Sequence, residues 1–281
     1  MVDSALEGCF AANAELPAAG LAEAMRYSLL AGGKRLRPIL LLEFCRICGG
    51  DPEKALPVAC GIEMLHTYSL IHDDLPCMDN DDLRRGKPTN HVVFGECTAT
   101  LAGDALQAEA FGAVLRSELP ADRRALCAEF LADAVGLDGM CGGQYLDMLF
   151  EGRELDERTL NEINSRKTGA LIIAACRMGV AAGGGGEERL SAAMRYGAAL
   201  GAAFQIRDDM LDVLGTAEVL GKPIGSDAQE KKNTYMALYG AERCTAMIDN
   251  LTAEAKRSLE GVFDDTELLC SLADSLAVRM N

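Results

Sequence analysis

The chain has 281 residues, of which 49% are hydrophobic and 25% charged, and its formal net charge at pH 7 is −16. This length is ample for a sizeable core, and the hydrophobic content argues against a disordered chain. The acidic balance argues against nucleic acid as a partner, because nucleic-acid binding needs a basic surface.

Alanine and leucine dominate, β-branched residues are sparse, and apolar residues recur at spacings of three and four. This pattern predicts helices, and no strand–turn–strand alternation stands out. The expected helices are 21–30, 37–49, 53–75, 96–117, 121–136, 139–150, 156–181, 187–214, 235–260 and 265–279. Glycines and prolines separate them, and the glycine run 183–186 is expected to be a mobile loop. We therefore expect a single all-α domain over 1–281.

The 11 cysteines are odd in number and irregular in spacing, so we interpret most of them as reduced thiols of the core. Cys45 and Cys48 have CxxC spacing, but no second pair or nearby histidine completes a zinc site. Residues 1–20 include no basic residue and do not resemble a secretory signal. No apolar run is long and uncharged enough for a transmembrane helix. We expect a cytoplasmic protein.

An acidic cluster follows the expected helix 53–75, and paired arginines come after it. The members are Asp73, Asp74, Asp79, Arg84 and Arg85. Pro76 ends the helix, so Asp79 lies beyond a turn. Carboxylates are ligands for Mg²⁺, and arginine side chains bind phosphate oxygens. Acids followed by arginines therefore indicate a diphosphate site rather than a solvated loop.

A second acidic cluster lies within the expected helix 187–214. Its members share one stripe of that helix: Gln205, Asp208, Asp209 and Asp212. Carboxylates this close destabilise a helix unless a cation compensates their charge. A ligand set of oxygens without cysteine or histidine suits Mg²⁺. The two clusters predict facing walls of one cleft that hold a polyphosphate through shared Mg²⁺.

A basic motif, Gly32-Gly33-Lys34-Arg35-Leu36-Arg37, comes earlier in the chain. The glycines let the backbone approach an anion closely, and the three cations supply charge. The spacing of a Walker loop and its Ser/Thr are absent. With the acidic clusters, this motif predicts two phosphorylated substrates. Lys167, Thr168, Lys222 and Lys232 are further candidates, although a lone lysine is more often a surface residue.

Together these motifs resemble the trans-prenyl diphosphate synthases, of the farnesyl and geranylgeranyl type. The similarity runs in family order over residues 32–38, 66–91, 103–104, 142–144, 167–168, 204–212, 221–222 and 232–235. The resemblance implies an all-α orthogonal helical bundle (isoprenoid synthase type I) around a central cavity, and a homodimer. It also implies isopentenyl diphosphate and an allylic diphosphate as substrates, with up to three Mg²⁺ ions per site.

The resemblance assigns a role to each matching residue. The implied Mg²⁺ ligands are Asp73, Asp79 and Asp208, with Asp74, Asp209 and Asp212 as ligands or support. The implied contacts to the allylic diphosphate are Arg84, Lys167 and Lys222. Those to isopentenyl diphosphate are Gly33, Lys34, Arg37, His66 and Arg85. The residues implied beside the reacting carbons are Thr168 and Gln205, and those implied to close the site are Lys232 and Arg279.

The implied reaction is ionisation, condensation and elimination. Mg²⁺ stabilises the charge on the departing pyrophosphate, and the double bond of isopentenyl diphosphate attacks the allylic cation. A proton is then lost. Because water would quench the cation, the site must exclude it.

Tyr68 lies five residues before Asp73, about 7 Å back along the helix. Tyr68 and its neighbour Ser69 are the candidates for control of product length. An aromatic residue here, with the additional Pro76 and Cys77 in the first motif, resembles bacterial farnesyl synthases, so we expect a C15 product. Helical geometry puts Tyr68 to one side of Asp73, so this expectation rests on the resemblance. Ordinary core packing of Tyr68 is the alternative.

Three other functions are alternatives. A geranylgeranyl (C20) or longer-chain synthase has the same motifs. A terpene cyclase shares the fold, but its second metal site usually has an Asn/Ser/Glu pattern in place of aspartates. A non-catalytic helical subunit typically loses part of an aspartate motif, whereas both motifs are complete here.

Overall fold

The computed structural model describes residues 1–10, 17–214 and 233–279. The elements of the first half are α1 Val2–Gly8, α2 Ala19–Leu29, α3 Leu36–Ile47, α4 Pro52–Asp73, β1 Leu83–Arg84, β2 Lys87–Pro88, α5 Asn90–Phe94, α6 Glu96–Leu115 and α7 Ala121–Val135. Those of the second half are α8 Met140–Leu149, α9 Glu157–Asn164, the π-helical turn η2 Ser165–Gly169, α10 Ala170–Gly183, α11 Glu187–Leu214, α14 Tyr235–Leu259 and α15 Glu267–Val278.

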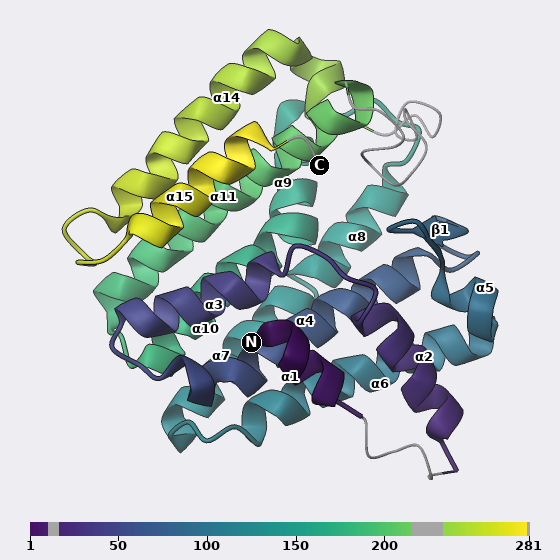
Figure 1. Ribbon diagram of the computed structural model, residues 1–281. Coiled ribbons are helices and arrows are strands. Elements are labelled where there is room, and N and C mark those ends of the chain that lie inside the picture. The colour runs from purple at the N-terminus through teal and green to yellow at the C-terminus, as the bar shows by residue number, and fades with distance from the viewer. Residues whose placement is uncertain (11–16, 215–232, 280–281) are drawn as a thin grey trace.

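The helices form one bundle, with α4 and α10 near its middle (Figure 1). Helix α4 packs against α3 and α6, and α10 packs against α3, α7 and α11. Helices α11, α14 and α15 lie alongside one another on one side of the molecule, and α2, α5 and α6 lie on the other. The all-α architecture expected from the sequence is therefore confirmed. No helix in the described ranges combines the length and the apolarity needed to cross a bilayer.

Helix α4 is central because it is apolar on nearly every side. Its start is capped by Asp51, whose side chain accepts a hydrogen bond from the N–H of Glu53, and Pro52 occupies the first turn. Most of its residues from Ala55 to Ile71 are buried. The helix ends at Asp73, so the first aspartate motif is carried to the end of a rigid, buried element.

The expected helices are present, with three local differences. The segment predicted as one helix over 156–181 is interrupted by the π-helical turn η2. Helices α1 and α5 are additional, because each is too short to give a periodic signal. The sequence predicts no hairpin, and this prediction is wrong, because β1 pairs antiparallel with β2. Its turn residues Arg85 and Gly86 have φ of 53° and 73°, as a two-residue hairpin turn requires.

The glycine run at 183–186 forms a compact helix-capping turn. Gly184 adopts the left-handed conformation, its N–H donates to the carbonyl oxygen of Ala181 (3.0 Å), and that of Gly185 donates to Val180 (2.9 Å). Helix α11 begins at Glu187. The run therefore joins α10 to α11 through satisfied backbone groups.

All eleven cysteines are free thiols. Their interpretation as core residues holds for the five that are buried, namely Cys45, Cys60, Cys127, Cys176 and Cys244. Cys9, Cys48 and Cys270 are partly buried and pack against the core, so the interpretation of most cysteines as core residues is confirmed, while Cys77, Cys97 and Cys141 are exposed.

Candidate active site

The first aspartate motif turns back on itself at the end of α4. The N–H of Asp79 donates to the carbonyl oxygen of Asp73 (2.9 Å), and that of Met78 donates to Leu75 (2.8 Å). These bonds bring Asp79 beside Asp73. Burial raises the pKa of Asp73 to about 6, Lys167 opposes this rise, and the charge of Asp79 adds to it. A carboxylate in this position is stabilised by a nearby cation.

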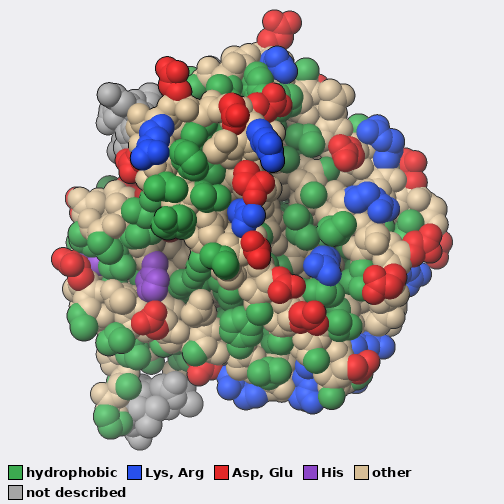
Figure 2. Space-filling model, turned by 180° about the vertical axis from the view of Figure 1, so that it is seen from behind, with side chains coloured by type: hydrophobic (Ala, Val, Ile, Leu, Met, Phe, Trp, Pro, Cys, Tyr) green, Lys and Arg blue, Asp and Glu red, His purple; other side chains and the backbone are tan. Residues whose placement is uncertain are grey.

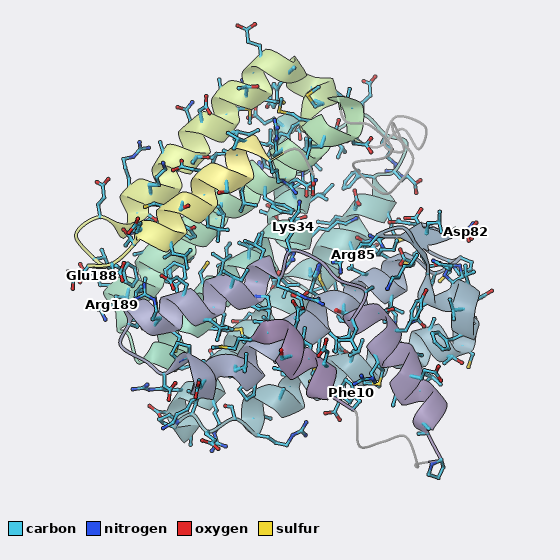
Figure 3. All side chains as sticks on the ribbon, viewed as in Figure 1. Phe10, Lys34, Asp82, Arg85, Glu188 and Arg189 are labelled. Atoms are coloured by element: carbon cyan, nitrogen blue, oxygen red, sulfur yellow. The ribbon has the colours of Figure 1, made fainter. Side chains whose placement is uncertain are left out.

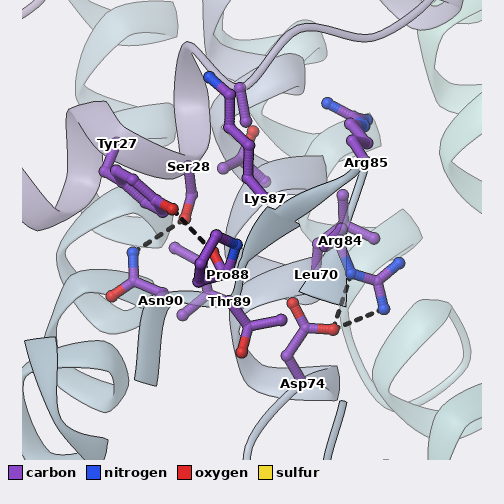
Figure 4. Close-up of a pocket in the computed structure, with 13 residues that line it drawn as sticks. Tyr27, Ser28, Leu70, Asp74, Arg84, Arg85, Lys87, Pro88, Thr89 and Asn90 are labelled. Atoms are coloured by element: carbon purple, nitrogen blue, oxygen red, sulfur yellow. Dashed lines mark hydrogen bonds and ion pairs between the residues drawn. The ribbon is translucent and has the colours of Figure 1, made fainter. Parts of the chain in front are cut away.

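Asp74 lines a different cavity, of about 30 Å³, beneath the hairpin (Figure 4). Its carboxylate accepts a hydrogen bond from Nε of Arg84 at 2.7 Å and is only 3% exposed. Burial raises the pKa of Asp74 above its usual range, and the hydrogen bond with Arg84 opposes that rise. Because Arg84 belongs to β1, the ion pair ties the hairpin to α4. Asp74 therefore supports an arginine that the sequence predicts to bind phosphate.

The hairpin and the loop before α3 form one basic group in the middle of the molecule, where Lys34 and Arg85 lie near each other (Figure 3). Nη1 of Arg85 donates to the carbonyl oxygen of Gly32, and a side chain at Gly33 would overlap the same guanidinium. Gly33 has a φ of 131°, which other residues rarely adopt. Gly32 has a φ of 89°, so both glycines are needed for the conformation of the loop.

His66 lies within this basic group. Burial holds its pKa well below the usual value, and the charges of Arg37 and Arg85 lower it further. His66 is therefore neutral near pH 7, with one ring nitrogen able to donate a hydrogen bond. The residues predicted to hold isopentenyl diphosphate are brought together here: Gly33, Lys34, Arg37, His66 and Arg85.

Arg35 differs from the other cations of the loop. Its left-handed backbone (φ 49°) turns the side chain into the protein. There it pairs with Glu63 (2.7 Å), with the two side chains 7% and 3% exposed, and with the exposed Asp3 (2.9 Å). The sequence-based assignment of three phosphate-binding cations to this loop is corrected to two, since Arg35 anchors the loop to α4.

The second aspartate motif lies on α11, and its acids have different surroundings. Asp208 is about half-exposed and pairs with Nη2 of Arg279 at 2.7 Å. The charge of Asp208 acts on both Lys34 and Arg37, so the motif faces the basic loop across the site. Arg279 also lies 4.0 Å from the ring of Phe204. The expected cleft between the two motifs is thus bordered by basic side chains.

Asp209 and Asp212 are buried, at 4% and 2% exposure. Asp209 accepts hydrogen bonds from Nε2 of Gln205 (2.9 Å) and from the backbone N–H of Tyr235 (2.7 Å). The hydroxyl of Thr168 donates to Oε1 of Gln205 at 2.8 Å. The predicted acidic stripe is therefore divided, because one acid faces outward while Asp209 fixes Gln205 and Thr168 in a hydrogen-bonded chain.

Lys167 lies in η2, between the first aspartate motif and α8. Its Nζ pairs with Asp147 at 2.6 Å, and its charge lowers the pKa of Asp73. A side chain at Gly143 would overlap the backbone of Lys167, so α8 and η2 pack in direct contact. Asp147 was not among the candidates from sequence; its one signal is its position three residues after Gln144, on the same face of the helix.

A cavity of about 530 Å³ extends from the first aspartate motif into the bundle. This volume lies within the range of about 300–1,000 Å³ that ligand pockets occupy. The cavity joins residues predicted from sequence, namely Arg37, His66, Tyr68, Ser69, Asp73, Lys167 and Thr168. It also joins residues that sequence reasoning missed, namely His72, Thr100, Met140, Cys141 and Met148.

The carboxylates fit Mg²⁺ in their chemistry, because their oxygens are the hard ligands that this ion prefers. Among the described residues, no three acidic, cysteine or histidine side chains lie close enough to hold an ion by themselves. Mg²⁺ commonly completes its coordination with waters and substrate phosphates. Asp73, Asp79 and Asp208 are thus suited to an ion that shares its ligands with a diphosphate. Lys222 and Lys232 lie outside the described residues.

Comparison with known proteins agrees with this geometry. The sequence model of the polyprenyl synthetase family matches residues 18–264. The chain is 46% identical over 263 residues to a geranylgeranyl diphosphate synthase of Cyanophora paradoxa (92% of this chain and 87% of that protein). It is 44% identical over 262 residues to a farnesyl diphosphate synthase of Bacillus subtilis (92% and 88%).

Solved structures support the same assignment. An FPP/GFPP synthase from Zymomonas mobilis superimposes with a TM-score of 0.86 at 38% identity, covering 98% of this chain and 96% of that one. A geranylgeranyl pyrophosphate synthetase from the archaeon Geoglobus acetivorans does so with a TM-score of 0.87 at 33% identity (99% and 97%). The chain therefore belongs to the polyprenyl synthetase family and is a trans-prenyltransferase.

Proposed function

We propose that this enzyme condenses an allylic diphosphate, dimethylallyl or geranyl, with isopentenyl diphosphate and releases pyrophosphate, with farnesyl diphosphate as the main product. One observation carries the proposal. A single cavity is lined by Asp73 and Lys167, by Arg37 and His66 of the basic group, and by Tyr68 together with apolar side chains. Such a cavity accommodates a charged head at one end and an apolar tail at the other. The enzyme consists of one domain over residues 1–281.

Each half of the site has its own task in this reaction. Asp73, Asp79 and Asp208 would hold Mg²⁺, which would supply positive charge near the departing diphosphate. Lys167 and Arg84 bind the same diphosphate.

The basic group holds the second substrate. Lys34, Arg37 and Arg85 neutralise its diphosphate, and the neutral His66 donates a hydrogen bond. Thr168 lines the cavity, and Gln205 is bonded to its hydroxyl, so their oxygens would lie beside the allylic cation. They are fixed by their own hydrogen bonds, so they stabilise positive charge without reacting with it.

The direct test is an assay of the purified protein with Mg²⁺, isopentenyl diphosphate and geranyl diphosphate. We expect release of pyrophosphate and formation of a C15 diphosphate, identified by chromatography. Absence of pyrophosphate release would disprove the proposed function. A C20 product would favour the second candidate, a geranylgeranyl synthase, which the similar identities to farnesyl and geranylgeranyl synthases support.

Tyr68→Ala tests whether the aromatic ring limits the tail. Tyr68 is 6% exposed and lines the same cavity as Asp73. Removing its ring opens space along α4, so we expect the main product to lengthen by at least one isoprene unit while the rate of the first condensation is retained. Chromatography of the dephosphorylated products measures the change, and unchanged lengths would assign Tyr68 to core packing alone.

We also propose a homodimer in the cytoplasm. Apolar side chains gather over part of the rear face (Figure 2). Exposed examples on α5 and α6 are Val92, Val93, Leu101 and Leu115. A monomer seldom leaves so many large apolar side chains in water, which supports a second copy as their partner. Sedimentation equilibrium, with a mass of twice 29.9 kDa as the expected value, measures the assembly.

A further inference from the structure

Two helices that line the main cavity are joined by one hydrogen bond between their side chains. The hydroxyl of Tyr68, on α4, lies 3.1 Å from Sγ of Cys141, on α8. Both residues line the cavity. Burial raises the pKa of Tyr68 above its usual value, and the contact with Cys141 raises it further, so the phenol is neutral and keeps its proton for hydrogen bonding.

The ring of Tyr68 is also held from its other side. It packs edge-on against the ring of His72, with centroids 5.2 Å apart and an interplanar angle of 87°. His72 in turn bonds through Nε2 to the carbonyl oxygen of Thr100 (3.0 Å) and lies against Gly103, where any side chain would overlap its ring. His72 is therefore fixed against α6, and the hydroxyl contact with Cys141 holds the other end of the Tyr68 ring.

The position of Cys141 relative to Tyr68 is fixed because the start of α8 is closely packed. A side chain at Gly142 would overlap the carbonyl oxygen of Leu137, and one at Gly143 would overlap the backbone of Lys167. The first turn of α8 thus packs at backbone contact on two sides. A residue in that turn has little freedom to move away from the cavity.

We infer that Cys141 is a positioning residue that holds Tyr68 across the cavity and thereby fixes the length of the product. This inference rests on the proposed function and adds a second determinant, from α8, to the aromatic residue on α4. Without the thiol, the ring of Tyr68 can rotate toward the wall, and the tail can pass. The product whose yield should then increase is the allylic diphosphate that is one isoprene unit longer than the normal product.

The test uses substitutions that separate the hydrogen bond from the volume of the cavity. Tyr68→Phe removes the bond and keeps the ring, Cys141→Ala removes the bond and adds a little space, and Cys141→Ser keeps a hydrogen-bonding group. We expect the ratio of C20 to C15 product to rise roughly fivefold for the first two, as expected from losing one net hydrogen bond. Cys141→Ser should retain the wild-type ratio.

The double variant Tyr68→Phe/Cys141→Ala gives the sharpest result. If both changes act through one bond, the double variant shifts the ratio no further than Tyr68→Phe alone. Cys97→Ala is the matched control, because Cys97 is an exposed thiol on α6 outside the cavity. We expect its ratio of C20 to C15 product to be unchanged. Cys141→Phe adds bulk and should shift the products toward C10.

Two outcomes would overturn the inference. One is a wild-type product ratio in both Tyr68→Phe and Cys141→Ala. The other is a shift in Cys141→Ala without one in Tyr68→Phe, which would mean that volume alone matters. Either result leaves the proposed condensation intact, whereas absence of any prenyl product from the wild-type enzyme would contradict the proposed function. If Cys141→Ala does not fold, Tyr68→Phe decides by itself.

Discussion

Asp73→Asn should lower the rate of pyrophosphate release by about 1,000-fold while the metal-free protein becomes more stable. The loss of rate follows from the proposed role as a metal ligand, because metal-mediated stabilisation of a leaving group contributes several kcal/mol, and each 1.4 kcal/mol is tenfold in rate. The measurement is the steady-state rate at saturating Mg²⁺ and both substrates. Asp82→Asn is the matched control, since Asp82 is an exposed acid of the same loop, at the outer edge of the molecule (Figure 3).

The gain in stability follows from the pKa of Asp73. Its value in the folded protein is about 6, above the ordinary 3.8, so the folded state binds more protons than the unfolded state between these pH values. Above pH 6 the charged carboxylate therefore costs folding free energy, and the cost disappears as the pH falls below 4. The neutral amide of the Asp73→Asn variant avoids this free-energy cost.

At about pH 8 we expect the free energy of unfolding of the variant to exceed that of the wild type by up to about 3 kcal/mol. This difference should vanish toward about pH 4. Thermal unfolding with a chelator present measures it. A variant that is fully active, or whose relative stability does not change with pH, would contradict the assignment of Asp73 as a half-buried metal-binding carboxylate.

Glu63→Ala should destabilise the protein by about 3–5 kcal/mol, because it leaves the guanidinium of Arg35 buried without its main partner. The carboxylate and guanidinium are 2.7 Å apart, and both are almost fully buried. Arg35 also fixes the loop that carries Lys34 and Arg37. We therefore expect the KM for isopentenyl diphosphate to rise more than the KM for the allylic substrate.

Asp3→Ala provides the control on the same guanidinium. Asp3 is 71% exposed, so its ion pair with Arg35 should contribute no more than about 1 kcal/mol. Thermal unfolding of the two variants compares the contributions to stability of the buried and the exposed ion pair. Equal losses of stability in both would show that the buried position of Glu63 has no special importance.

The arrangement of residues within each motif was predictable from sequence because each motif is local. Asp73 and Asp79 are six residues apart, and the turn after Pro76 brings them together through backbone hydrogen bonds alone. The position of Gln205 relative to Asp209 follows from one turn of a helix. The cations of the basic loop likewise lie within a few residues of one another.

Other features depend on which helices become neighbours. Asp74 looked like Asp73 in the sequence, yet it pairs with Arg84, because the hairpin folds back over that side of α4. Arg35 has the same charge as Lys34, but its left-handed backbone turns it toward Glu63. The hairpin itself was missed because strands of two residues show no alternation.

The amino-acid sequence by itself determined the all-α class and the positions of the two carboxylate motifs, because helical periodicity and short-range clusters are properties of neighbouring residues. The tertiary structure alone decided that Asp147 pairs with Lys167 and that Cys141 meets Tyr68. These partners are 20 and 73 residues apart along the chain. Lys167 and Asp147 meet because Gly143 allows the backbone of α8 to pack directly against η2, a contact that no local pattern encodes.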